Sequence, residues 1–167
     1  MKKIEVTFIG DYKLGDNIAY NFKILQALYN AQAQLSNDHE RCLLNKPITV
    51  ILISIIEALL HDFFFRIKSH TSENSINLPK SVLDEIRTKK HNKFNHYIDA
   101  ITKYGTSFDS KAKIKKFHAG LTKLQQLRNR VHIQNTRKQL EKDEVKAFTA
   151  EKKVLAEKYL EFFLGVF

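Results

Sequence analysis

Apolar residues recur along most of the chain at spacings of three and four, the pattern of helices that bury one face. The most apolar stretch, from Pro47 to about Ser69, predicts the central, almost fully buried helix of a bundle. Stripes before and after it predict further helices, marked by Ile18, Phe22, Leu25 and Tyr29, by Val82, Leu83 and Ile86, by Phe94, Tyr97, Ile98, Ile101 and Tyr104, by Ile114, Phe117, Leu121, Leu124 and Val131, and by Val154, Leu155, Tyr159, Phe162 and Phe163. We therefore expect an all-α fold, a single helical bundle of about five helices.

Polar residues predict where these helices begin and end. Asp16 is the expected N-cap of the first helix, because a short side-chain acceptor satisfies free backbone N–H groups there. Ser36–Glu40 is the expected break before the central helix, which should begin near Pro47 because proline is favoured in a first turn. Residues 4–9 alternate loosely and are expected to be extended, within one domain that covers residues 1–167.

Three features predict a cytoplasmic protein without a membrane span. The apolar pieces of residues 48–65 are too short to cross a bilayer and are interrupted by side chains that would be costly there, Glu57, His61 and Asp62. The basic start Met1–Lys3 is followed by a short apolar segment interrupted by Glu5, which argues against a secretory signal. The single Cys42 excludes an internal disulfide and fits a reducing compartment.

Positive charge is concentrated in one part of the sequence. The net charge is +10, and the stretch from Asp109 to Leu140 has nine lysines and arginines against one acidic residue. Such a stretch can bind a polyanion, since neutralising phosphates releases counterions, or it can be an ordinary solvated helix face. The candidate RNA-binding residues are Lys111, Lys113, Lys115, Lys116, Lys123, Arg130, Arg137 and Lys138.

One arginine interrupts the apolar stripe of this basic stretch. Arg128 follows Leu124 by four residues and Leu121 by seven, so on a regular helix it lies on the apolar side. His132 follows one turn later, at the edge of the stripe, whereas Arg130 and Lys123 should point away from it. Because an arginine is rarely buried without a partner, we expect Arg128 to face a cleft or a subunit interface.

The heptapeptide Leu127–Ile133 (LRNRVHI) resembles the signature of the HEPN superfamily, an Arg, usually an Asn beside it, and a His a few residues on. Members of that family are small helical bundles with the motif near the end of a late helix, followed by a loop and a closing helix. The apolar residues 51–60 resemble the family's central helix. Three residues separate Arg128 from His132, fewer than the family usually has, although this spacing keeps both on one helix face.

The resemblance implies a metal-independent endoribonuclease without a cofactor, a hydrolase of the toxin–antitoxin or antiviral defence type. It implies a homodimer with two motifs meeting across the interface, and an antitoxin or regulatory partner. Arg128 would stabilise charge on the phosphorane, His132 would act as general acid or base for attack of the ribose 2′-OH, and Asn129 would orient the site. Two alternatives stay open: a non-catalytic helical RNA-binding or regulatory module, and a helical scaffold with a merely soluble basic face.

Three polar residues on the central helix form a second candidate group. Ser54, Glu57 and His61 fall on one side of an otherwise apolar helix. Two interpretations stay open. Glu57 can pair with His61 one turn on, which makes the group a satisfied buried pair. Alternatively, the three residues form a polar wall of the same cleft, with Glu57 pairing with Arg128.

Overall fold

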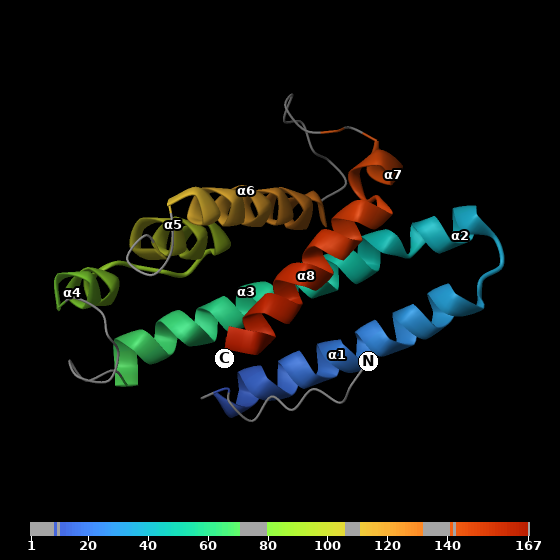
Figure 1. Ribbon diagram of the computed structural model, residues 1–167. Helices are drawn as coiled ribbons and strands as arrows, with labels where there is room; N and C mark the ends of the chain where they lie inside the picture. The colour runs from blue at the N-terminus through green and yellow to red at the C-terminus, as the bar shows by residue number, and fades with distance from the viewer. Residues whose placement is uncertain are drawn as a thin grey trace. The chain divides into compact units, whose positions relative to one another are not determined.

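The computed structural model describes residues 9, 11–70, 80–105, 111–131, 141 and 143–166 of the chain. Every regular element within this part is helical, and it contains no strand (Figure 1). The elements are α1 (Tyr12–Gln34), α2 (Asp38–Leu43), α3 (Asn45–His70), α4 (Lys80–Thr88), α5 (Phe94–Gly105), α6 (Lys111–Arg128), the 3₁₀ turn η1 (Asn129–Val131), α7 (Glu144–Ala147) and α8 (Ala150–Val166). The predicted all-α class is confirmed. The described residues include six α-helices of nine residues or more and two shorter ones, α2 and α7. The extended segment expected at residues 4–9 lies outside the described residues except for Ile9.

The first helix begins earlier than the sequence predicted. Asp11, not Asp16, is the N-cap of α1, and its side chain accepts a hydrogen bond from the backbone N–H of Leu14 at 3.1 Å. Asp16 is an exposed residue within the helix. The prediction was wrong because both aspartates can cap, and the choice depends on where the backbone leaves the extended conformation.

The expected break at Ser36–Glu40 is shorter than predicted, because α2 begins within it. Asn37 caps α2 by accepting a hydrogen bond from the backbone N–H of His39 at 2.8 Å. The central helix α3 then begins at Asn45, which leaves Pro47 in its first turn, where its missing N–H costs nothing. The predicted central helix is therefore confirmed, with a start two residues earlier.

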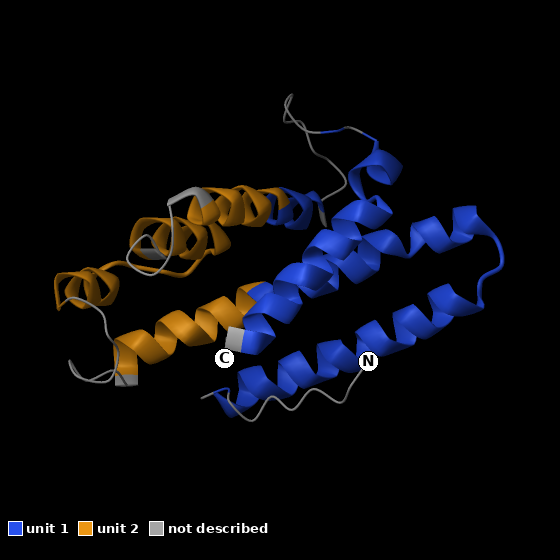
Figure 2. Cartoon of the chain, in the orientation of Figure 1, with its two compact units in different colours: residues 1–56, 124–167 blue, residues 57–123 orange. Residues whose placement is uncertain are grey.

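The chain divides into two compact units, and the division falls within α3 and α6 (Figure 2). Unit 1 comprises residues 1–56 and 124–167, and unit 2 comprises residues 57–123. That the chain is one domain stays a prediction.

Unit 1 contains a core of α1, the first part of α3 and α8, including the fully buried Leu25, Ile48 and Ile53. Gln32 of α1 is buried with both ends of its amide satisfied. Its Nε2 donates to the Arg41 carbonyl at 2.7 Å and to Asn45 Oδ1 at 3.0 Å, and its Oε1 accepts from Lys153 Nζ at 2.7 Å. Because all these partners are supplied, the buried amide joins α1 to three other helices, α2, α3 and α8, at little desolvation cost.

Thr49 of α3 is fully buried, and its hydroxyl has no hydrogen-bond partner among the described residues. We expect Thr49→Val to raise the free energy of unfolding by about 1 kcal/mol, because valine has the same shape without the unsatisfied hydroxyl. Chemical denaturation measures this change. Thr122→Val is the control, since the Thr122 hydroxyl donates to the His118 carbonyl at 2.9 Å and its loss should not stabilise. A less stable Thr49→Val protein would contradict the expectation.

Unit 2 contains the rest of α3, α4, α5 and most of α6, with an aromatic centre at Phe64. The Phe64 ring stacks on Tyr97 at 5.5 Å between centroids and on His91 at 5.1 Å. Asp62 is 1% exposed, and its carboxylate forms an ion pair with Arg66 at 2.8 Å, which explains how an acidic residue is held inside.

By length and composition alone, the helical stretch Asp38–Ser69 could cross a membrane, with a mean hydropathy of 2.0 over its most apolar window. Of that window, 56% is buried within the structure, and the core helix of a soluble protein has the same properties. The absence of a membrane span therefore stays a prediction.

Candidate nucleic-acid site at the end of α6

The end of α6 buries a different face from the one that the sequence predicted. Leu121 and Leu124 are fully buried as expected, but the next buried position is Leu127, 6% exposed, and Arg128 is exposed. On a regular helix Arg128 lies between Leu121 and Leu124 in angle, yet its side chain is exposed, so burial of the stripe does not extend to it. That Arg128 faces a cleft or a subunit interface stays a prediction.

Arg130, expected to point away from the stripe, is 4% exposed. The reason is local geometry. The α-helix ends at Arg128, and Asn129–Val131 form a 3₁₀ turn, in which residues three apart point the same way. Arg130 follows the buried Leu127 by three residues and therefore turns inward. Its expected role as an RNA-binding surface residue was wrong.

The buried guanidinium belongs to a network of charged groups that joins three parts of unit 1. Arg130 Nη1 donates to the Glu141 carbonyl, and Nη2 donates to Glu144 Oε1 at 3.0 Å. The other carboxylate oxygen, Glu144 Oε2, accepts from Lys46 Nζ at 2.5 Å. Lys46 also lies over the Phe148 ring, 5.6 Å from its centroid. We call Lys46, Arg130 and Glu144 the Arg130 network.

The electrostatics of Glu144 reflect both its partners and its partial burial. Burial acts to raise the pKa of the Glu144 carboxyl, but hydrogen bonds from Lys46 and Arg130 outweigh it, so the pKa is lowered from its ordinary value. The carboxylate is therefore fully ionised at neutral pH and accepts from both cations at once. The Arg130 network ties the η1 turn to α7 and to the start of α3, and so fixes the backbone that carries Arg128 and Asn129.

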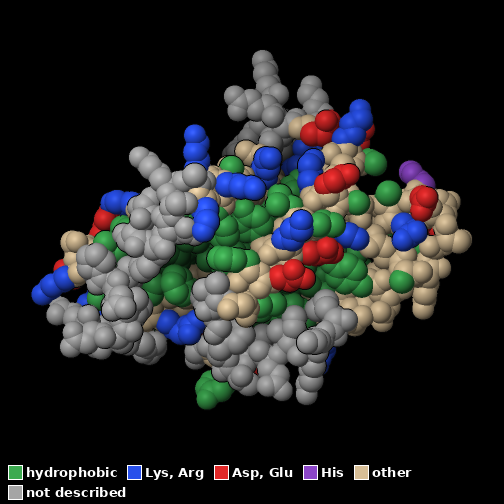
Figure 3. All heavy atoms as spheres, viewed as in Figure 1, with side chains coloured by type: hydrophobic (Ala, Val, Ile, Leu, Met, Phe, Trp, Pro, Cys, Tyr) green, Lys and Arg blue, Asp and Glu red, His purple; other side chains and the backbone are tan. Residues whose placement is uncertain are grey.

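Arg128 and Asn129 are both exposed at the junction of α6 and η1. Among the predicted RNA-binding lysines, the described side chains are also exposed: Lys113, Lys115, Lys116 and Lys123. The side chain of Lys111 and the residues His132, Arg137 and Lys138 lie outside what the structure describes. Figure 3 shows lysine and arginine side chains spread over the visible face, with hydrophobic side chains between them.

Ser54 and His61 of the second candidate group have partners of their own, and the role of the group as a wall of the cleft stays a prediction. Ser54 is exposed, and its hydroxyl donates to the Val50 carbonyl of its own helix at 2.9 Å. His61 Nδ1 lies 2.8 Å from the Tyr97 hydroxyl, a partner that sequence spacing could not supply. Burial, and to a smaller extent the charge of Glu57, raises the pKa of Tyr97. The pairing of Glu57 with Arg128 stays a prediction.

Sequence reasoning missed the Arg130 network altogether. One signal was available, because an arginine close to apolar residues needs a carboxylate, and Glu141, Asp143 and Glu144 follow the motif. Which of these acidic residues pairs with Arg130 depends on the path of the chain between the motif and that residue. Lys46 lies 98 residues from Glu144, beyond the reach of any local pattern.

No group of three or more His, Cys, Asp and Glu side chains in the described part of the chain is arranged to hold a metal ion. Comparison of the chain with protein-family models, with curated proteins and with solved structures finds no match. The likeness to the HEPN superfamily stays a prediction that rests on the Arg128–His132 motif and its helical setting.

Proposed function

We propose that the protein is a HEPN-type endoribonuclease that cleaves RNA without a metal ion or cofactor. The observation that carries the proposal is the exposed Arg128-Asn129 pair on a turn whose backbone the Arg130 network holds in place. Phosphate chemistry without a metal needs a fixed cation, and a side chain on an anchored turn meets that need better than one on a free loop. His132, three residues further on, supplies a group that titrates near neutral pH.

In the proposed reaction, His132 takes the proton of a ribose 2′-OH while that oxygen attacks the adjacent phosphorus. The 2′-O–P bond forms and the P–O5′ bond breaks, which leaves a 2′,3′-cyclic phosphate and a 5′-oxygen that takes a proton from water to become a hydroxyl. Arg128 stabilises the negative charge that develops on the phosphoryl oxygens, and Asn129 orients the phosphate. We further propose that the protein is a cytoplasmic toxin or antiviral defence effector, and that an antitoxin or regulatory partner inhibits it.

The direct test is incubation of the purified protein with mixed RNA in the presence of EDTA. We expect fragments that end in 2′,3′-cyclic phosphate, because the proposed attack is internal to the RNA and needs no metal. Mass spectrometry of the fragment ends identifies this product. Intact RNA, or fragments formed only when magnesium is added, would contradict the proposal.

Assembly is a separate prediction. The proposed site requires a two-fold homodimer that brings two copies of Arg128 to a shared groove. Light scattering at micromolar concentration should give twice the mass of one chain. A strictly monomeric mass would count against the dimer and would weaken the nuclease proposal.

A second candidate function is RNA binding without catalysis, which the exposed lysines of α6 favour. We expect binding to weaken steeply with salt, and Lys115→Glu/Lys116→Glu to weaken it for all RNA sequences alike, because phosphate contacts carry no sequence information. Lys13→Glu/Lys23→Glu on α1 is the matched control, with the same change in net charge on exposed residues. Filter binding at several salt concentrations measures the effect, and equal weakening by both double variants would leave α6 without a special role.

A further inference from the structure

Unit 1 contains a pocket of about 340 Å³ between α1, α3 and α8, three helices that all contribute to this unit (Figure 2). Most of the pocket lining is apolar, and each of the three helices contributes to it. The apolar lining residues are Phe22 of α1, Leu52 of α3, and Leu160 and Leu164 of α8. The volume lies at the lower end of the about 300–1,000 Å³ of pockets that hold small organic molecules.

The polar side chains of the lining offer a ligand acceptors rather than donors. Tyr29 donates its hydroxyl hydrogen to Glu157 Oε1, and Gln26 Nε2 donates to Asn30 Oδ1 at 2.8 Å. Burial first, and then the bond to Glu157, raise the pKa of Tyr29, so the hydroxyl keeps its proton and this bond at neutral pH. The Gln26 carbonyl oxygen, Glu157 Oε2 and both carboxylate oxygens of Glu161 have no hydrogen-bond partner among the described residues.

Two carboxylates give the pocket a negative charge, although the whole chain has a net charge of +10. Glu157 and Glu161 lie one turn apart on α8, and neither forms an ion pair with another described residue. The bond from Tyr29 leaves the charge of Glu157 in place, because the hydroxyl that donates it is neutral. The pocket therefore presents uncompensated negative charge beside an apolar surface.

The two lysines of α8 closest in sequence to Glu157 do not supply the missing cation. Lys153 Nζ donates to Gln32 Oε1 at 2.7 Å and lies 5.6 Å from the centroid of the Tyr29 ring. Lys158 is exposed and does not line the pocket. A ligand has to bring the positive charge that this lining lacks.

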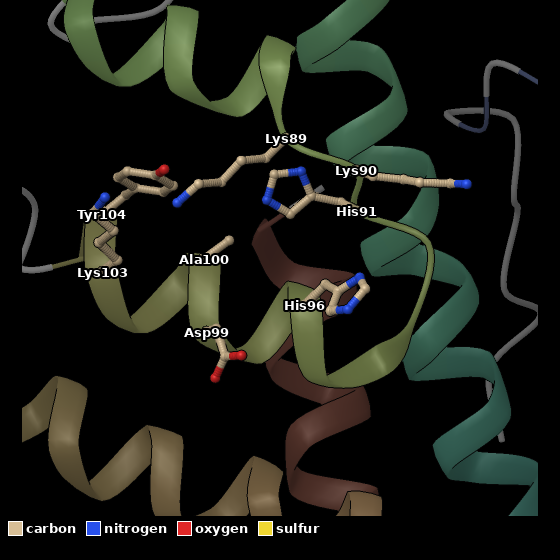
Figure 4. Close-up of a pocket in the computed structure, with 8 residues that line it drawn as sticks. All are labelled: Lys89, Lys90, His91, His96, Asp99, Ala100, Lys103 and Tyr104. Atoms are coloured by element: carbon tan, nitrogen blue, oxygen red, sulfur yellow. The ribbon is translucent and has the colours of Figure 1, made fainter.

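Another pocket, of about 240 Å³ in unit 2, differs in this respect (Figure 4). Its Lys89 and Lys103 already form ion pairs with one carboxylate, Glu85. Figure 4 shows Lys90 extending away from both, and Asp99 lines the same pocket. The charged groups there largely compensate one another, whereas those of the unit 1 pocket do not.

We propose that the unit 1 pocket binds a small organic amine, with an ammonium group on an apolar body of about the size of a phenethyl group. The ammonium supplies both the positive charge and the hydrogen-bond donors, and a charged hydrogen bond to a carboxylate is stronger than a neutral one. The apolar body covers Phe22, Leu52 and Leu160, which removes apolar surface from water. The site is independent of the proposed RNA cleavage, because it uses neither Arg128 nor His132.

Isothermal titration calorimetry on the full chain, at an ionic strength of about 0.15 M, tests the proposal. The probes are phenethylamine, ethylamine, 2-phenylethanol and 3-phenylpropionate. We expect saturable binding of phenethylamine with a Kd below about 1 mM, and binding at least about tenfold weaker for the others, because each lacks the apolar body or the positive charge. Equal binding of any of these three, or no saturable heat with phenethylamine, would overturn the proposal.

Variants of α8 separate the pocket from general electrostatics. Glu161→Gln should weaken phenethylamine binding about tenfold, because it removes a charge from the lining with little change of shape. Glu151→Gln is the matched control, an exposed glutamate of the same helix that does not line the pocket. It lies about 15 Å from Glu161 along the axis, where salt screens most of the attraction, so it should change the Kd less than about twofold.

A third variant fills the pocket without a change of charge. Leu164 is partly exposed, so Leu164→Trp places a larger side chain in the pocket at its open side and should abolish binding in a folded protein. Circular dichroism checks the fold of each variant. Equal effects of Glu161→Gln and Glu151→Gln would show diffuse attraction only and overturn the proposal, even if Leu164→Trp fails to fold.

Discussion

Replacing Glu144 with alanine should lower the free energy of unfolding by about 3 kcal/mol, because the change removes the carboxylate partner of a buried arginine. Arg130 is 4% exposed, so water cannot take the place of Glu144 at its Nη2. Lys46 loses the same partner at 2.5 Å. Glu144 itself is 36% exposed, which places the expected cost at the lower end of the about 3–5 kcal/mol typical of broken buried pairs.

We expect replacement of Arg130 to cost less stability than replacement of its partner Glu144. Arg130→Met removes the buried charge and keeps most of the apolar stem, and it leaves Glu144 paired with Lys46. It should therefore cost only about 1 kcal/mol, since replacing a buried charge by an apolar group of similar size is often nearly neutral. In the Arg130→Met protein, Glu144→Ala should cost much less than in the wild type.

Urea denaturation of the four proteins measures these differences, with Glu40→Ala, an exposed acidic residue of α2, as the control. The pH dependence gives an independent check. The pKa of Glu144 is lowered in the folded protein, so its stabilisation is present above the ordinary value of 4.5 and is lost as the pH falls through the lowered value. The Glu144→Ala protein should lack this part of the acid dependence. Equal costs for Arg130→Met and Glu144→Ala would mean that burial of the charge does not control the stability of this region.

Arg128→Ala and His132→Ala should each lower the rate of RNA cleavage by about a hundredfold or more, if the proposed mechanism holds. Arg128 is exposed, so its loss should leave the free energy of unfolding within about 0.5 kcal/mol of the wild type. A large loss of rate without a loss of stability is the signature of a catalytic residue. The double variant should be little slower than either single one, because residues that act as a unit are not additive.

The structure changes which residue can serve as the control in this experiment. Arg130 lies two residues from Arg128 but is part of the Arg130 network, so its replacement would disturb the backbone that carries the motif. Lys123→Ala is the suitable control, because Lys123 is an exposed candidate RNA-binding residue on the same helix, so its replacement should lower RNA affinity but not the cleavage rate at saturating RNA. A binding module without catalysis would lose affinity to similar extents with Lys123→Ala and Arg128→Ala. Full cleavage by a folded His132→Ala protein would end the catalytic proposal.

Most of the helices could be predicted from the sequence, because the signal for a helix is local. The stripe of α5 and the continuous apolar run of α3 each specify a buried face within one segment, whatever the rest of the chain does. The ends of the helices were harder to predict, also for a local reason. Asp11 and Asp16 are both good caps, and the short helix α2 has no apolar stripe by which to recognise it.

The candidate site could be predicted only in part. The sequence by itself placed Arg128 and Asn129 near the end of a late helix, because the motif and the helical spacing are both visible within a few residues. It predicted an exposed Arg130, which is buried, since a regular helix through residue 130 would turn this side chain away from the apolar stripe. The 3₁₀ turn changes the angle between successive side chains and turns Arg130 inward.

Only the tertiary structure decided what the buried arginine contacts. Glu144 lies 14 residues after Arg130, and Lys46 lies 98 residues before Glu144, so no periodic pattern relates the three. The same holds for Glu85 and Lys103, which are 18 residues apart and form an ion pair in unit 2. Helices form because neighbouring residues repeat at a fixed spacing, whereas charged side chains find their partners through the path of the whole chain, which packing of the apolar faces determines.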